Sequence, residues 1–518
     1  MPSKPTRKTE VQAYRFELRR MNSALVRNDA VMLHDPLRTH TRATVVGVIV
    51  AAIGLLGFMI FGIISPAAQP PEDGIVIGQE SGQMYVKVGE PRDMLIPTFN
   101  LASARLILMS RQGEQAVQPV VVADDNLKGI PRGRLQGIPG GPPLLPASDQ
   151  RISNNWAVCH YLPLQNRYSE DVRLAKAEQN QQTAVLAGLP PSQLGTPLQR
   201  NEAIYVEQPD GKRYLIYRPE ENPNRQSDIV RAEVPNDPAV IEALKLDRYE
   251  PRPMSLGLMN AIPEVNPLVP PIPDEIMADS VPFELDGEPT VVGDVFSVEQ
   301  PDGGDDYYVV LPDGKQQVTE AVATIIRYRF STGATIPQVS PDQLDELPTV
   351  PESAELPVAN YPAQIPTVLD PLRGTPATCL GWSLTGSGDD LNARTTLYVN
   401  DEIPFPEGEN GLAVTKANED GIPVDYFYMP PGRAAVVNSA TSEASFESGP
   451  IQLVSDHGLR YGIPDTETAA YLGLTERSPA PESILRLLPT GESLNVQDAA
   501  QTFDSVEVAP NSGDYEGQ

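Results

Sequence analysis

Cys159 and Cys379 are the residues with the clearest potential for covalent chemistry, because they are the chain's two cysteines. Both lie beyond a long apolar segment, and an even cysteine count in an oxidising compartment favours a disulfide. Each lies three residues from one of the two tryptophans, Trp156 and Trp382. We therefore expect one bridge with the indoles packed around it, which would stabilise the fold by about 5 kcal/mol in a chain-entropy model. The alternative is two buried free thiols.

Metal and nucleophile signals are weak. The histidines lie at positions 34, 40, 160 and 457, and no pair has zinc-finger or HExxH spacing. We expect His160 to be a surface residue beside the bridge. The sequence Gly381-Trp-Ser383-Leu-Thr-Gly386 misses the GxSxG spacing by one residue, and Asp302-Gly-Gly-Asp-Asp306 lacks the ligand order of an EF-hand loop. The sequence therefore predicts no catalytic residue, no metal site and no cofactor.

Two Gly-Lys pairs could suggest a phosphate-binding loop. They are Gly211-Lys212 and Gly314-Lys315. Neither pair has a glycine five residues upstream, and neither lysine precedes Ser or Thr, so the P-loop pattern is not met. Both pairs lie in segments that favour hairpin turns rather than a strand-to-helix loop. We expect them to be turn residues.

An uncharged run of 22 residues, Ala43 to Ile64, is long enough to cross a bilayer. The 42 residues before it carry nine Lys/Arg and four Asp/Glu, whereas the whole chain has a net charge of −30. Basic flanks favour the cytoplasm, so we expect a single-pass inner-membrane protein with a cytoplasmic N-terminus and an acidic periplasmic region. A cleaved signal peptide is the alternative. The acidic balance also argues against nucleic-acid binding.

The segment before the span has a helical pattern. Val11, Tyr14, Leu18, Met21 and Leu25 repeat at spacings of three and four residues, so they share one helix face, and Arg15, Arg19 and Arg20 flank it. Such a helix has nothing of its own to bury this face against, which predicts contact with a partner helix or the membrane surface. A solvated basic segment is the alternative. Within the span, Ala43, Gly47 and Ala51 form a small-residue face suited to close helix packing.

A hexapeptide, Val-Glu-Gln-Pro-Asp-Gly, occurs twice, at 206–211 and at 298–303. Pro-Asp-Gly is typical of a turn, and apolar or Tyr-rich stretches flank both copies, so each predicts a β-hairpin. A helical segment follows each hairpin, and looser copies begin near Ile75 and Ile451, with a related hairpin expected within Leu412–Val437. Residues 141–162 and 366–405 carry the cysteines and are expected to meet in a central domain.

These patterns predict an α+β fold. It has one N-terminal transmembrane helix, then an elongated periplasmic region of about four strand–turn–strand–helix repeats around a central, disulfide-containing mixed β domain. The expected segments are a cytoplasmic helix (1–42), the span (43–64), repeat 1 (73–130), the first part of the core (131–200), repeat 2 (201–290), repeat 3 (291–336), a proline-rich linker with the second part of the core (337–405), repeat 4 (406–448), a repeat-like segment returning to the core (449–503) and a disordered acidic tail (504–518).

Several motifs along the chain resemble one family. They are Tyr14-Arg-Phe-Glu-Leu-Arg-Arg-Met21, Ala24-Leu-Val-Arg27, Met32-Leu-His-Asp-Pro36, Phe99-Asn-Leu-Ala-Ser-Ala-Arg-Leu-Ile-Leu108, Arg460-Tyr-Gly-Ile-Pro464 and Leu487-Leu-Pro-Thr-Gly491. Together they are similar to EccB, a membrane component of the ESX (type VII) secretion systems of mycobacteria. The resemblance runs from residue 11 to about residue 500.

The resemblance implies a structural subunit of a secretion complex. Its partners would be an EccC-like motor ATPase, EccD-like and EccE-like membrane subunits, a mycosin protease and other EccB copies. Members of the family are sometimes labelled ATPases, and the absence of a phosphate-binding motif puts that label in doubt. ATP hydrolysis and binding of the cell wall by the repeats remain the alternative functions.

Overall fold

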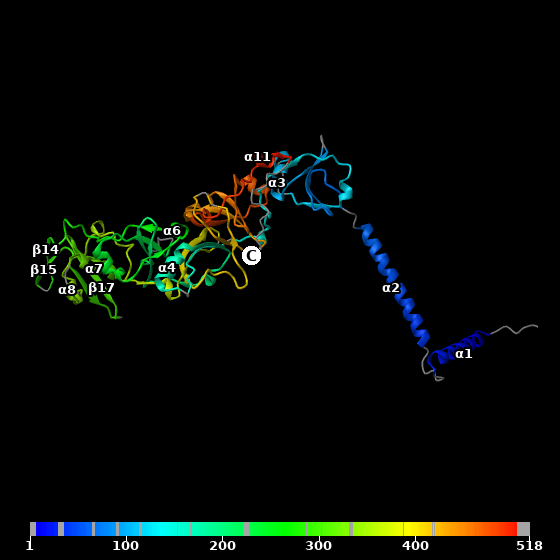
Figure 1. Cartoon of the computed structure of the whole chain (residues 1–518), viewed down its shortest axis with the longest axis horizontal. Coiled ribbons are helices and arrows are strands. Elements are labelled where there is room, and N and C mark those ends of the chain that lie inside the picture. The colour runs from blue at the N-terminus through cyan, green and yellow to red at the C-terminus, as the bar shows by residue number, and fades with distance from the viewer. Residues whose placement is uncertain are drawn as a thin grey trace, which may run out of the picture. The chain divides into compact units, whose positions relative to one another are not determined.

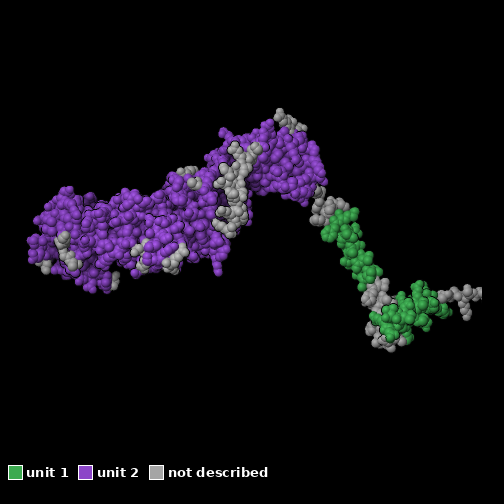
Figure 2. All heavy atoms as spheres, in the orientation of Figure 1, with its two compact units in different colours: residues 1–69 green, residues 70–518 purple. Residues whose placement is uncertain are grey.

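The chain divides into two compact units, Met1–Gln69 and Pro70–Gln518 (Figure 2). A computed structural model provides the coordinates. The residues that the structure describes are 7–28, 36–64, 68–89, 93–112, 117–152, 154–165, 168–220, 227–285, 287–301, 303–330, 335–386, 388–416, 418 and 420–504. Asp302 and the predicted acidic tail after Asp504 lie outside them.

In its described residues, the first unit contains helices α1 and α2 (Figure 1). Helix α1 spans Lys8–Arg27 and ends at Asn28, whose φ of 55° is left-handed, as is common after a helix. Helix α2 spans Pro36–Ile64, and its window Arg42–Met59, with a mean hydropathy of 2.1, is long and apolar enough to cross a membrane. The predicted N-terminal helix and the apolar helix are both present.

Four sheets of the second unit share one strand order. In each sheet, three antiparallel strands are followed by a helix, and the chain then returns beside the first strand and parallel to it. The first sheet contains β1 (Gly74–Gly78), β2 (Met84–Val88), β3 (Met94–Pro97), α3 (Leu101–Gln112) and β4 (Val120–Val122). The second contains β9 (Glu202–Glu207), β10 (Arg213–Tyr217), β11 (Val230–Glu233), α5 (Pro238–Ala243) and β12 (Arg252–Pro253), with β13 (Glu264–Val265) and β19 (Thr367–Val368) added at its sides.

The third and fourth sheets repeat this order. The third contains β16 (Val295–Glu299), β17 (Asp305–Leu311), β18 (Gly314–Val318) and α7 (Glu320–Phe330), and its return is a single parallel bridge from Gln338 to Ser297. The fourth contains β24 (Ala434–Ala440), β25 (Ile451–Ser455), β26 (Arg460–Ile463), α9 (Thr466–Tyr471) and β27 (Ser478–Pro481). The hairpins expected at both copies of the hexapeptide are confirmed, since β9 pairs with β10 and β16 with β17.

A seven-stranded central sheet brings together distant parts of the sequence. Its order is β22-β23-β7-β6-β20-β21-β8. The strands are β6 (Asn155–Tyr161), β7 (Gln182–Ala187), β8 (Thr196–Pro197), β20 (Ala377–Thr385), β21 (Asn392–Asn400), β22 (Leu412–Ala413) and β23 (Tyr426–Tyr428). The pairing of β6 with β20 confirms that the two cysteine-bearing segments meet, and the α+β class is confirmed.

The remaining elements are short or connect the sheets. They are α4 (Glu170–Gln179), α6 (Leu256–Ala261), α8 (Pro341–Leu344), α10 (Glu482–Leu485), α11 (Val496–Ala499), β5 (Leu135–Gln136), β14 (Ser280–Leu285), β15 (Glu288–Val291), β28 (Thr502–Phe503) and eight 3₁₀ turns among the described residues, η1 (Asp124–Leu127), η2 (Ser148–Gln150), η3 (Pro191–Gln193), η4 (Leu246–Arg248), η5 (Glu352–Ala354), η6 (Pro371–Arg373), η7 (Gly388–Asp390) and η8 (Glu443–Ser445).

The hairpin expected within Leu412–Val437 is only partly present. Strand β22 does pair with β23, but both belong to the central sheet. Strand β24 pairs instead with β25 and β27 in the fourth sheet. The fourth sheet therefore begins with β24 at Ala434, and the expected division of the chain into repeats after residue 448 stays a prediction.

Buried residues link the sheets in pairs. One apolar cluster contains residues of the first and fourth sheets together with α3, α9 and α11, and another contains residues of the second and third sheets. Figure 1 shows α3 and α11 side by side, and strand β28 pairs with β5. Because the end of the second unit packs against its beginning, the two ends of this unit stabilise each other.

Candidate functional site

Helix α1 presents a largely exposed apolar surface. Tyr14 is 65%, Met21 59% and Leu25 82% exposed, and Val11 and Leu18 on the same face are 38% and 40% exposed. The three arginines named from the sequence, Arg15, Arg19 and Arg20, lie on this helix as well. A surface with this many large apolar side chains is typical of a protein or membrane contact. The identity of what it contacts stays a prediction.

Ala43, Gly47 and Ala51 all lie on α2 at intervals of four residues, so they share one helix face. A side chain added at Gly47 would meet no atom within 4 Å. No described residue of the first unit covers this position, which leaves the close approach of another helix sterically open.

The predicted bridge between Cys159 and Cys379 is present. The two residues lie directly opposite each other on β6 and β20, with their Cα atoms 4.0 Å apart, and both are fully buried. The bridge closes a sequence separation of 220 residues. It joins a strand that precedes the second and third sheets to one that follows them, so both sheets lie within the closed loop.

The indoles do not surround the bridge, contrary to the expectation. Trp156 and Trp382 are also directly opposite each other on β6 and β20, but they belong to a different buried cluster from the cysteines. Side chains three residues apart point to opposite faces of a strand. The sheet therefore carries the disulfide on one face and the tryptophan pair on the other, where Trp382 packs edge-to-face on Phe446.

His160 is fully buried, so its expected place on the surface was wrong. It shares the tryptophan face of β6, and its Nδ1 accepts a hydrogen bond from the Ser255 amide at 3.3 Å. Burial, with the Arg252 cation nearby, lowers the pKa of His160 to about 3. Arg252 is itself buried and donates to the carbonyls of Thr375 and Pro376. These hydrogen bonds of Arg252 fix β12, the return strand of the second sheet, to the start of β20.

Gly211-Lys212 lies in the turn between β9 and β10, as expected, whereas Gly314-Lys315 is the first pair of residues of β18, directly after the turn that follows β17. The Lys212 ammonium lies 3.0 Å from a Glu233 carboxylate oxygen. The Lys315 ammonium donates to the Leu344 carbonyl at 2.5 Å and lies 3.7 Å from Asp345. Both lysines therefore bind local acceptors next to β-turns, which is not the strand-to-helix setting of a phosphate-binding loop. Among the described residues, no group of His, Cys, Asp and Glu could hold a metal ion.

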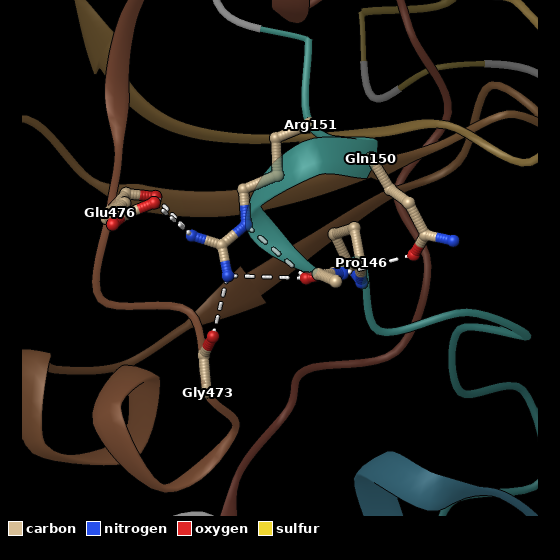
Figure 3. Close-up of polar contacts among 6 residues, drawn as sticks. Pro146, Gln150, Arg151, Gly473 and Glu476 are labelled. Carbon is tan, nitrogen blue, oxygen red and sulfur yellow. Dashed lines mark hydrogen bonds and ion pairs between the residues drawn. The ribbon is translucent and has the colours of Figure 1, made fainter.

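Arg151 forms a junction that the sequence did not indicate (Figure 3). Its guanidinium donates to the carbonyls of Pro146, Gly473 and Glu476, and its Nη1 lies 3.6 Å from the Glu476 carboxylate. Arg105 on α3 donates to the carbonyl of Leu472. Both arginines thus meet the carbonyl end of α9, where a cation is favoured. The acceptors at Leu472, Gly473 and Glu476 lie more than 300 residues from these arginines in the chain, so no local pattern could indicate these contacts.

A family model, described as "Type VII secretion system ESX-1, transport TM domain B", matches residues 3–508. The chain is 31% identical to the ESX-3 secretion system ATPase EccB3 of Mycolicibacterium smegmatis, over 98% of this chain and 92% of that protein. It is also 31% identical to the ESX-5 secretion system ATPase EccB5 of Mycobacterium marinum, over 97% of this chain and 94% of that protein.

Solved structures agree with the sequence matches. A chain of an intact ESX-5 inner membrane complex has a TM-score of 0.66 and 29% identity, with 98% of both chains covered. A chain of the EccB3 dimer from the ESX-3 core complex has a TM-score of 0.65 and 27% identity, covering 83% of this chain and all of that one. Because the family model and these relatives cover nearly the whole chain, it belongs to the EccB family of type VII (ESX) secretion systems.

Proposed function

We propose that this chain is a structural subunit of a type VII secretion core complex in the inner membrane. In this proposal α2 crosses the membrane, α1 lies in the cytoplasm, and the second unit builds the periplasmic part of the complex. The observation that carries the proposal is the exposed apolar face of α1, next in sequence to a helix able to span the membrane. The relatives support it, since two of the similar structures come from ESX complexes.

The apolar face of α1 would dock the cytoplasmic motor and the neighbouring membrane subunits. These partners are an EccC-like ATPase and EccD-like and EccE-like proteins, while a mycosin protease and other EccB copies would meet the second unit. The four sheets with a common strand order would be the repeats of the periplasmic part. Helix packing through Ala43, Gly47 and Ala51 would fix α2 among the other spans of the complex.

A matched pair of substitutions on α1 tests the docking role. Leu18→Glu places a charge on the apolar face, whereas Gln12→Glu places the same charge on the opposite side of the helix. We expect Leu18→Glu to reduce co-purification of the motor and EccD-like subunits at least tenfold, and Gln12→Glu to leave it unchanged. Equal recovery of partners with both variants would refute docking through this face.

ATP hydrolysis is the second candidate, because the relatives carry the word ATPase in their names. The local acceptors of Lys212 and Lys315 argue against a role for these two lysines in binding phosphate. We expect any ATP turnover by the purified full chain to be the same in a Lys212→Ala/Lys315→Ala variant and to fall with further purification. Turnover that copurifies stoichiometrically with the chain would favour the hydrolase instead.

A further inference from the structure

The apolar residues of α1 follow a seven-residue repeat. Their spacings alternate between three and four, which is the pattern of the two core positions, a and d, of a heptad. Position a holds Val11, Leu18 and Leu25, and position d holds Tyr14 and Met21. These five side chains are between 38% and 82% exposed. A seam of a and d residues is narrower than the apolar face with which a helix lies on a membrane, and it is typical of packing against another helix.

The positions on the two sides of this seam carry opposite charges. Position g holds Glu10 and Glu17 on one side, and position e holds Lys8, Arg15 and Asn22 on the other. In a parallel pair of identical helices, each g residue lies beside the e residue five positions further along the second helix. Glu10 of each copy would then meet Arg15 of the other, and Glu17 would meet the uncharged Asn22. In an antiparallel pair, g faces g and e faces e, so like charges would meet. The charges of α1 therefore complement a second, parallel copy of α1.

The membrane would bring two such helices together in this orientation. Helix α1 precedes α2 in the chain, so copies that cross the membrane in the same direction present α1 in the same direction as well. With 20 residues, α1 provides about three heptads, which is marginal for a helix pair in free solution. Confinement to one membrane raises the effective concentration of one α1 for another, and so favours pairing without any further contact.

We propose that the α1 helices of two copies of this chain pair as a parallel, two-stranded coiled coil before other subunits dock. The pairing rests on the proposed function, which places α1 of every copy in the cytoplasm. It buries the same apolar face that the motor and the membrane subunits would use. A paired copy therefore has to open before those subunits dock, and docking exchanges one helix partner for another.

Cysteine cross-linking of the full chain, in lipid vesicles without other subunits, tests the pairing. Leu25→Cys lies at core position a, whereas Val26→Cys lies at position b, on the outside of the coil, and the two native side chains are similarly exposed, at 82% and 86%. In a parallel pair the two copies of residue 25 are neighbours, but in an antiparallel pair centred on Leu18 they are about 21 Å apart. We expect mild oxidation to link Leu25→Cys at least five times as much as Val26→Cys. The native cysteines are buried and bonded to each other, so they do not take part.

A charge reversal beside the seam tests the predicted ion pair. In the Leu25→Cys background, Arg15→Glu places a carboxylate beside Glu10 of the second copy, so cross-linking should fall at least fivefold. Arg19→Glu makes the same change at position b, away from the seam, and is the matched control. Its cross-linking should stay within twofold of the parent variant.

Two outcomes would overturn the proposal. Equal linking of Leu25→Cys and Val26→Cys would show that the copies lie near each other without forming this coil. Equal losses with Arg15→Glu and Arg19→Glu would mean that the overall charge of α1, through attraction to anionic lipid headgroups, brings the helices together. Because no other subunit is present, failure of the pairing leaves the co-purification test on Leu18 unaffected, and failure of docking leaves the cross-linking result unaffected.

Discussion

At the scale of single residues, the central sheet separates two kinds of buried group by strand geometry. The disulfide lies on one face of β6 and β20, and the tryptophan pair and His160 lie on the other. The buried imidazole next to Arg252 is neutral, because a second buried cation there would be strongly disfavoured. Because the imidazole is neutral in the folded chain, the free energy of unfolding depends on pH.

We expect the stability of the second unit to fall in acid because of His160. Its pKa is about 3 in the folded chain and about 6.5 when unfolded, so the unfolded chain binds the extra proton first as the pH falls. The free energy of unfolding should therefore decrease between about pH 6.5 and pH 3, by at most about 1.4 kcal/mol per pH unit from this residue.

Denaturation midpoints measured from pH 7.5 to pH 4 check this expectation. His160→Asn keeps an acceptor near Nδ1 but cannot titrate, so its midpoint should change less with pH than that of the wild type. His457→Gln, at a side chain that is 60% exposed, should retain the wild-type pH dependence. Parallel curves for His160→Asn and the wild type would show that another group dominates.

At the scale of elements, the hairpins depend on glycine for different reasons. Gly211 has a φ of +82°, and a Cβ there would meet nothing within 4 Å. Gly314 has a φ of +142°, and a Cβ there would lie 2.2 Å from the Pro348 carbonyl oxygen. That carbonyl accepts a hydrogen bond from the Lys315 amide, which attaches segment 348–350 to β18.

Replacing each of these glycines by alanine should therefore give unequal effects. Gly211→Ala should cost about 1 kcal/mol, which is the cost of a left-handed alanine alone. Gly314→Ala should cost at least about 2 kcal/mol, because the backbone of Pro348 must also move. Thermal unfolding of both variants and the wild type measures the difference. Equal midpoints for the two variants would contradict the close approach at Gly314.

At the scale of the whole second unit, the chain runs outward through the second and third sheets and then returns. The disulfide closes this excursion, and the contacts of Arg105 and Arg151 with the end of α9 connect the beginning of the unit to its end. Of these links, only the covalent disulfide persists in the unfolded chain, and a cross-link that closes a longer loop removes more of that chain's conformational freedom.

Cys159→Ala/Cys379→Ala should lower the free energy of unfolding by about 2–5 kcal/mol, because the unfolded chain gains the freedom of a loop of 220 residues. Urea denaturation without reductant measures the loss. Dithiothreitol should destabilise the wild type once denaturant exposes the buried bridge, and should have no effect on the double alanine variant. Equal stability of the oxidised wild type and the double variant would contradict this role.

The sequence by itself determined the features that depend on local pattern. The spacing of Val11, Tyr14 and Leu18 predicted α1, the uncharged run predicted α2, and Pro-Asp-Gly predicted two hairpins, since periodicity and turn chemistry act within a few residues. The count of cysteines and the segments carrying them predicted the bridge and the meeting of β6 with β20.

Only the tertiary structure decided what depends on partners far apart in the chain. It buried His160, placed the indoles away from the disulfide, and joined β24 to the fourth sheet. It also gave Gln208 a hydrogen bond to the Met254 carbonyl and Gln300 one within its own hairpin, although both occur in the same hexapeptide. The physical reason is that burial and hydrogen-bond satisfaction are set by whichever element packs alongside, and identical local sequences carry no information about that neighbour.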